Sequence, residues 1–173
     1  MMRQKAAWMI LVAPLFLMGL SCPPGDPDDG RVPVVCFGPD PQALRIEFRL
    51  IEATTATSGR VEIKGIVDNY GMEEFRSGQG QQSAQLFEGN TLVAENLLVE
   101  HEFLNLALDE TISVEYERDW DTADEFLPSE YTLYVNLDPD IFIDGNEQND
   151  DCNTNNNMLQ RSTTDINALF SGG

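Results

Sequence analysis

The chain has 173 residues, with 10 Lys and Arg against 30 Asp and Glu, and a formal net charge of −20. This length predicts one domain of ordinary size. The acidic excess argues against DNA or RNA as a partner, because phosphate binding needs clustered Lys and Arg. His101 is the single histidine of the sequence, which excludes any mechanism or metal site that requires two.

The first 21 residues have the layout of a secretory signal peptide. Arg3 and Lys5 precede an apolar run at residues 6–20 that Pro14 and Gly19 alone interrupt. The run is too short to span a bilayer comfortably. We therefore expect residues 1–21 to be a signal peptide and the protein to be exported.

The end of this segment, Gly19-Leu-Ser-Cys22, resembles the end of a lipoprotein signal, with the small Ser21 just before the cysteine. The leucine that such signals usually carry three residues before the cysteine is displaced by one position. Two predictions stay open: Cys22 is lipidated with acyl chains such as palmitate, which anchor the protein to a membrane, or a plain secretory signal is cleaved nearby. Residues 22–31, rich in Pro, Gly and Asp, predict a disordered, solvated tether.

Two further cysteines, Cys36 and Cys152, remain once Cys22 is assigned to the lipid. A chain bound for an oxidising compartment favours pairing of such cysteines. We predict a disulfide between Cys36 and Cys152, with two free buried thiols as the alternative.

From residue 32 onward the pattern indicates β-strands. In residues 44–50 the apolar residues Leu, Ile and Phe occupy every second position, and Arg and Glu lie between them. This alternation places one apolar face of a strand against a core. We expect further strands at residues 61–67, with a bulge near Gly65, on both sides of a tight turn at Gly89 and Asn90, at 112–116, at 131–137 and near 157–161. About seven one-sided strands predict an all-β fold, an immunoglobulin-like antiparallel β-sandwich over residues 32–162, followed by a flexible tail at 163–173.

Signals for enzyme activity are nearly absent. His101 has no second histidine nearby, and neither Cys36 nor Cys152 has a histidine base to spare. Thirty carboxylates make adjacent acid pairs, such as Glu73 with Glu74, expected by chance. We predict that the protein is not an enzyme, while a small hydrolase built from two unmarked carboxylates stays open as an alternative.

The acidic, amide-rich run at residues 138–156 is a candidate metal loop, because calcium prefers carboxylate and amide oxygens. The spacing does not fit an EF-hand loop. The competing interpretation is a series of turns in which Asn and Asp side chains bond to their own backbone. We predict no dedicated cofactor site, but weak calcium binding at about millimolar affinity. The candidate metal ligands are Asp138, Asp140, Asp144, Glu147, Asp150 and Asp151.

Four motifs occur in an order that resembles a known family. They are Val67-Asp-Asn-Tyr-Gly71, Gln85-Leu-Phe-Glu-Gly89, residues 108–116, and residues 130–138 leading into Ile143-Asp-Gly-Asn-Glu-Gln-Asn149. In this order, residues 43–160 resemble the CARDB domain (cell-adhesion-related domain found in bacteria), an immunoglobulin-like module of exported proteins. The chain departs from the family at Asp109 and at Ser129 or Glu130, where the family has glycine, and in an Asn-rich turn expanded by residues 150–154.

The resemblance implies a fold and a function class. The family is not enzymatic as a rule and offers no catalytic residues. Combined with the lipid anchor predicted at Cys22, it leads us to expect a lipoprotein of the bacterial cell envelope, at the outer membrane, whose domain binds or adheres to an envelope protein or a glycan. A calcium-binding exported module, with residues 138–156 ordered by the metal, is the main alternative.

Overall fold

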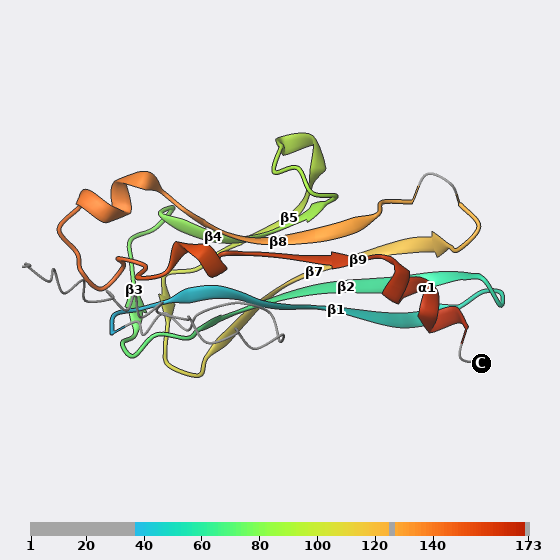
Figure 1. Cartoon of the computed structure of the whole chain (residues 1–173), viewed down its shortest axis with the longest axis horizontal. Helices are drawn as coiled ribbons and strands as arrows, with labels where there is room; N and C mark the ends of the chain where they lie inside the picture. Colours follow the sequence, from blue (N-terminus) through green and yellow to red (C-terminus); the bar gives the residue numbers. More distant parts are fainter. Residues whose placement is uncertain (1–36, 125–126, 172–173) are drawn as a thin grey trace, which may run out of the picture. The chain divides into compact units, whose positions relative to one another are not determined.

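The computed structural model describes residues 37–124 and 127–171. The fold of this part is all-β, as predicted, with antiparallel sheets and one short helix (Figure 1). Within it, no helix is long and apolar enough to cross a membrane. The predicted signal peptide, the tether, the lipidation site Cys22 and the cysteine Cys36 lie outside the described residues.

One sheet has three strands in the order β1-β2-β7. Its outward face is charged, and ion pairs such as Arg49 with Glu62 (2.7 Å) and Lys64 with Glu115 (2.6 Å) connect neighbouring strands. Such exposed pairs contribute little stability each, so the sheet depends on the apolar residues of its other face. The strands are β1 (Pro41–Ala53), β2 (Ser58–Asn69) and β7 (Thr111–Asp121).

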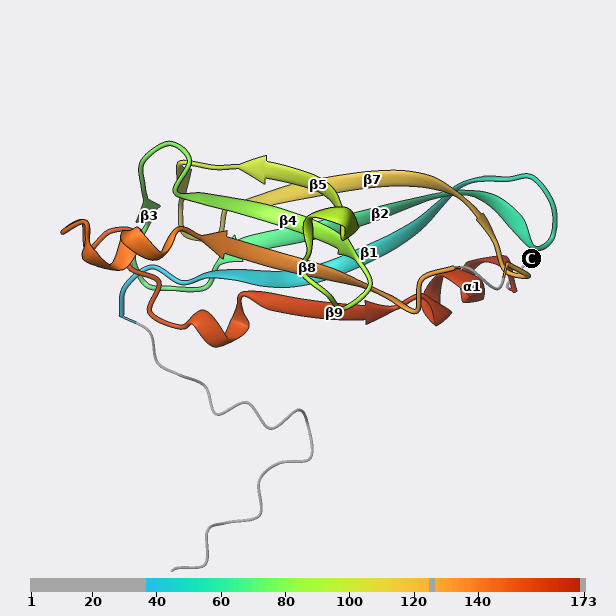
Figure 2. The ribbon, with the colours of Figure 1, turned by 90° about the horizontal axis from the view of Figure 1, so that it is seen from above.

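A second sheet has four strands in the order β5-β4-β8-β9 (Figure 2). In a small third sheet β3 pairs with β6. These strands are β3 (Phe75–Arg76), β4 (Gln82–Glu88), β5 (Leu97–Glu102), β6 (Asn105–Leu106), β8 (Glu130–Leu137) and β9 (Met158–Ser162). Three 3₁₀ turns and one helix complete the fold: η1 (Ala94–Asn96), η2 (Pro139–Ile143), η3 (Thr154–Asn156) and α1 (Thr164–Phe170).

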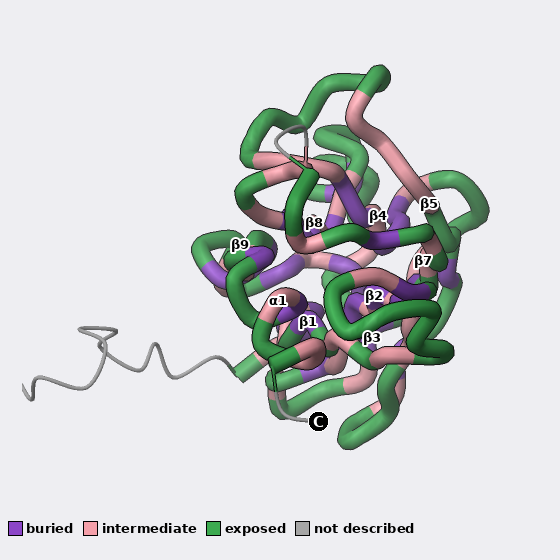
Figure 3. The backbone as a smooth tube through the Cα atoms, turned by 90° about the vertical axis from the view of Figure 1, so that its right-hand side faces the viewer, coloured by how far each residue is buried: buried purple, intermediate pink, exposed green. Residues whose placement is uncertain are grey.

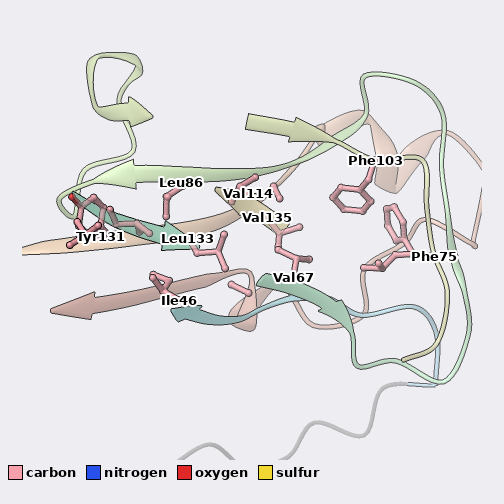
Figure 4. Packing of buried hydrophobic residues seen from close by; sticks show 14 of the residues in the cluster. Ile46, Val67, Phe75, Leu86, Phe103, Val114, Tyr131, Leu133 and Val135 are labelled. Carbon is pink, nitrogen blue, oxygen red and sulfur yellow. The ribbon is translucent and has the colours of Figure 1, made fainter. Parts of the chain in front are cut away.

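The two larger sheets share one hydrophobic core. Buried side chains are contributed by both sheets, among them Val67 and Val114 from the first and Leu86, Leu133 and Val135 from the second (Figure 4). Figure 3 shows buried residues on strands of both sheets and mostly exposed loops. The alternation that predicted strands at 44–50, 112–116 and 131–137 is therefore confirmed as the core-facing pattern of β1, β7 and β8.

The bulge expected near Gly65, before Val67, lies on the partner strand instead: the register of β1 shifts between Ala43 and Arg45, opposite Ile66 and Val67. Gly65 has a different role. A Cβ atom at this position would lie 2.6 Å from Leu133 Cδ1 and 3.0 Å from Val114 Cγ2. Glycine therefore lets β2 approach β8 across the core more closely than any other residue would.

Two other segments differ from expectation. The strand expected directly after the turn at Gly89 and Asn90 begins only at Leu97, and the exposed residues 91–93 precede η1 instead. Residues 163–173 are predicted as a flexible tail, but residues 164–170 form α1. This helix buries Ile166 completely, and the Trp120 indole Nε1 donates a hydrogen bond to Asn167 Oδ1 (2.9 Å).

Tyr131 provides a test of core packing through pH. The side chain is fully buried, and burial raises the pKa of its hydroxyl from 10.0 to about 12, although the nearby Arg118 guanidinium lowers it. The neutral phenol is thus favoured in the folded state. The stabilisation of the folded state by the neutral Tyr131 phenol is fully present below pH 10 and is lost as the pH rises toward 12.

We expect the wild type to lose about 2 kcal/mol of stability relative to Tyr131→Phe between pH 9.5 and pH 12, because phenylalanine does not titrate. Denaturant midpoints measured for both proteins across this range check the prediction. Parallel curves for the two proteins would contradict it.

Candidate functional site

The loop between β8 and β9 is built from side chains that bond to nearby backbone. Asp138 Oδ1 accepts from Asp140 N (3.0 Å), Asp144 Oδ1 from Asn146 N (2.7 Å), and Asp151 Oδ1 from Asn153 N (2.9 Å). This turn pattern is the structural interpretation that the sequence offered for the loop, and it is confirmed for these three carboxylates.

The six predicted metal ligands do not gather at one point. Within the described residues, no group of three or more His, Cys, Asp or Glu side chains is placed to hold a metal ion. Asp144 instead accepts from Asn149 Nδ2 (2.9 Å) and from Gln81 Nε2 (3.0 Å), and these donors together with Asn146 N hold its pKa below the ordinary value. Weak calcium binding by this loop stays a prediction.

A different combination of oxygen-bearing side chains does come together, where the end of this loop meets the residue just before β1. Asp40 Oδ1 accepts from Asn156 Nδ2 at 2.9 Å, and Asp151 Oδ2 accepts from Asn157 Nδ2 at 2.7 Å. All four side chains are more than nine-tenths buried. We call Asp40, Asp151, Asn156 and Asn157 the buried carboxylate cluster.

The cluster is electrostatically unusual. Burial is the main cause that raises the pKa of Asp40 and of Asp151, and the negative charge of Asp40 raises the pKa of Asp151 further. In the part of the chain that the structure describes, no Lys or Arg forms an ion pair with either carboxylate. Two like charges thus share a site that water scarcely reaches.

The cluster depends on Asn69, the last residue of β2. Its Oδ1 accepts from Asp40 N (3.0 Å) and Gly71 N (3.1 Å), and its Nδ2 donates to the carbonyl oxygens of Glu73 (2.7 Å) and Leu106 (3.0 Å). Gly71 is required here, because a Cβ atom would lie 2.2 Å from the Gly38 carbonyl oxygen. Asn69 therefore fixes where Asp40 lies.

Cys152 lies beside this region and is disulfide-bonded. Its backbone N donates to the Pro39 carbonyl at 3.1 Å, and its Cβ lies 4.0 Å from the place of a Cβ on Gly38. The loop is thus held against the residues just before β1. Both other cysteines lie outside the described residues, so the pairing of Cys36 with Cys152 stays a prediction.

The remaining candidates for chemistry are placed as ordinary surface residues. His101 is exposed on β5, and its Nδ1 lies 3.2 Å from the Ser113 carbonyl oxygen. Glu74, from the acid pair with Glu73, forms an ion pair with Arg76 at 2.6 Å. These contacts stabilise turns and strands and do not bring a base to a nucleophile.

Sequence reasoning missed Asp40, Asn156 and Asn157 as members of one cluster. Asp40 and Asn156 are 116 residues apart, and Asp40 lies between two prolines in a segment without strand alternation. The density of asparagine before β9 was the one available signal, and it is equally typical of turns.

Comparisons of the chain with protein-family models, curated proteins and solved structures give no match.

The role of Asn69 predicts a large effect of its removal. Asn69→Ala leaves four buried or partly buried backbone groups without their partner, so we expect the free energy of unfolding to fall by about 3 kcal/mol. Chemical denaturation measures this loss. Asn155→Ala, at an exposed position of η3, is the matched control and should change stability by less than about 0.5 kcal/mol. Equal losses in the two variants would show that Asn69 has no special role.

Proposed function

We propose that the chain is an exported, lipid-anchored lipoprotein of the bacterial envelope whose folded part is an immunoglobulin-like module for binding or adhesion. The observation that carries this proposal is the strand order. β1, β2 and β7 correspond to strands A, B and E of an immunoglobulin-type sandwich, and β5, β4, β8 and β9 correspond to C′, C, F and G.

Side chains at the centre of the sandwich agree with this assignment. In antibody domains a disulfide joins strands B and F, and a tyrosine lies two residues before the second cysteine. Here Gly65 on β2 packs against Leu133 on β8, and Tyr131 lies two residues before Leu133. The Tyr131 hydroxyl differs in its partner, because it lies 3.3 Å from Arg118 Nη1.

The structure gives a physical explanation for residues at two places where the chain was compared with the family. Asp109 takes the place of a family glycine and has φ of 61°, a left-handed conformation that Asp tolerates better than most residues. Asn69 and Gly71, from the motif after the second strand, form the turn described above. Both observations support a CARDB-like domain.

Export is supported by the disulfide at Cys152, because such bonds persist mainly in oxidising compartments. The signal peptide, the lipid on Cys22 and the outer-membrane location are supported by the sequence alone. A lipidated Cys22 followed by a short tether places the domain near a membrane surface, where recognition rather than turnover is the expected task.

Mass spectrometry of the processed protein tests the anchor. We expect a chain that begins at Cys22 and carries acyl chains, and that has lost two hydrogens through the bond between Cys36 and Cys152. Cys22→Ser is the control and should move the protein from the membrane fraction to the soluble fraction. An unmodified terminus, or one at another residue, would end the lipoprotein proposal.

The binding surface that we propose is an exposed apolar patch formed by Tyr70, Met72 and Leu108, which are 66%, 61% and 49% exposed. These side chains surround one surface depression together with Asp68 and Asp109. Exposed apolar groups with a polar rim mark protein interaction sites. The acidic rim fits an envelope protein whose own apolar surface is bordered by Lys or Arg.

Capture from solubilised envelope by wild type and variants tests this surface. Tyr70→Ser combined with Met72→Ser is expected to reduce recovery of the specific partner at least tenfold, and raised salt should weaken capture by the wild type. Leu92→Ser combined with Val93→Ser, exposed before η1, is the control and should leave recovery unchanged. Equal recovery by both double variants would exclude the patch.

A further inference from the structure

The buried carboxylate cluster has more acceptors than donors. Asp40 Oδ2, Asn156 Oδ1 and Asn157 Oδ1 are buried and have no hydrogen-bond partner among the described residues. Asp40 is completely buried, and Asn156 and Asn157 are 7% and 6% exposed. Unpartnered buried oxygens of this kind are rare in folded proteins and indicate a missing water or ion.

The type of missing group follows from the charges. Asp40 and Asp151 bring two carboxylates into one buried region, with no cationic side chain of the described residues paired to either. Buried charges are found paired with an opposite charge or coordinated to a metal, because their desolvation is otherwise too costly. A set of carboxylate and amide oxygens, without nitrogen or sulfur ligands, suits a hard cation.

We propose that Asp40, Asp151, Asn156 and Asn157 bind a divalent cation, and that this cation is calcium. The amide Nδ2 atoms of the two asparagines already lie within 2.9 Å and 2.7 Å of carboxylate oxygens. Rotation of each amide by 180° about χ2 exchanges Nδ2 for Oδ1 without moving the backbone. Such a rotation is unfavourable beside a bare carboxylate, and a cation between the oxygens makes it favourable.

This site goes beyond the proposed binding module and differs from the loop site that the sequence suggested. Of the six loop carboxylates, only Asp151 takes part. Asp40 comes from the segment just before β1, and the other three ligands come from the segment just before β9. Calcium would therefore link the segment just before β1 to the end of the β8–β9 loop, near the disulfide-bonded Cys152.

The ligand set also predicts affinity and selectivity. Two carboxylates are few for a calcium site, so we expect dissociation constants of about 0.1–1 mM, as in extracellular modules. Magnesium should bind more weakly, because it demands near-ideal octahedral geometry and gives up its water reluctantly.

The test is thermal unfolding of the full processed chain in 10 mM calcium and in chelator at matched ionic strength. We expect calcium to raise the wild-type Tm by about 3–8 °C, with a smaller shift in magnesium. Asp40→Asn and Asp151→Asn should lose the shift. Glu147→Gln, which neutralises an exposed carboxylate of the same loop, should keep it.

Baseline stability separates a binding defect from a folding defect. In chelator, Asp40→Asn should be at least as stable as wild type, because it removes one of two buried like charges and offers a donor to the unpartnered oxygens. Calorimetric titration of folded wild type with calcium gives an independent measurement, with one site expected. Absence of binding, a shift that magnesium or sodium reproduces in full, or loss of the shift in Glu147→Gln would each overturn the proposal and leave water as the occupant.

Discussion

The four hydrogen bonds of the Asn69 side chain are the constraint on which much of this structure depends. They join the residue before β1, the turn after β2 and the end of β6. An aspartate could not replace Asn69. Two of the four bonds need a side-chain N–H donor, and a carboxylate only accepts hydrogen bonds. Through Asp40 N, the same side chain holds the buried carboxylate just before β1. The position of a charged group is thus determined by an uncharged residue on another strand.

The close approach of the two sheets at Gly65 is the second constraint. With no side chain on Gly65, Leu133 fills the space between β2 and β8. Under the immunoglobulin-type strand assignment that we propose, this contact corresponds to the region where antibody domains use a disulfide. The disulfide-bonded Cys152 lies at the periphery instead, beside Pro39. Dispersion and burial therefore hold the centre of the domain, while a covalent bond restrains the loop at its edge.

The sequence predicted strands well where a strand buries one face and exposes the other. The alternations in β1, β7 and β8 were clear, because each extends over five or more residues of the strand. The helix α1 was not predictable in the same way, since its seven residues make about two turns and bury completely only Ile166. Leu92 and Val93 suggested a strand but are exposed. The buried carboxylate cluster is non-local, and no pattern along the chain relates Asp40 to Asn156.

The location of these contacts has a mechanical consequence under the proposed anchor. Tension on a lipidated Cys22 would reach the fold at the residues just before β1. Asp40 N is held by Asn69, Pro39 O by Cys152 N, and Asp40 Oδ1 by Asn156. The load is thereby shared with β2 and with the loop before β9, and a disulfide from Cys36 to Cys152 together with calcium at Asp40 would reinforce the same junction. If the proposed anchor holds, these contacts reinforce the domain at the point where its tether begins.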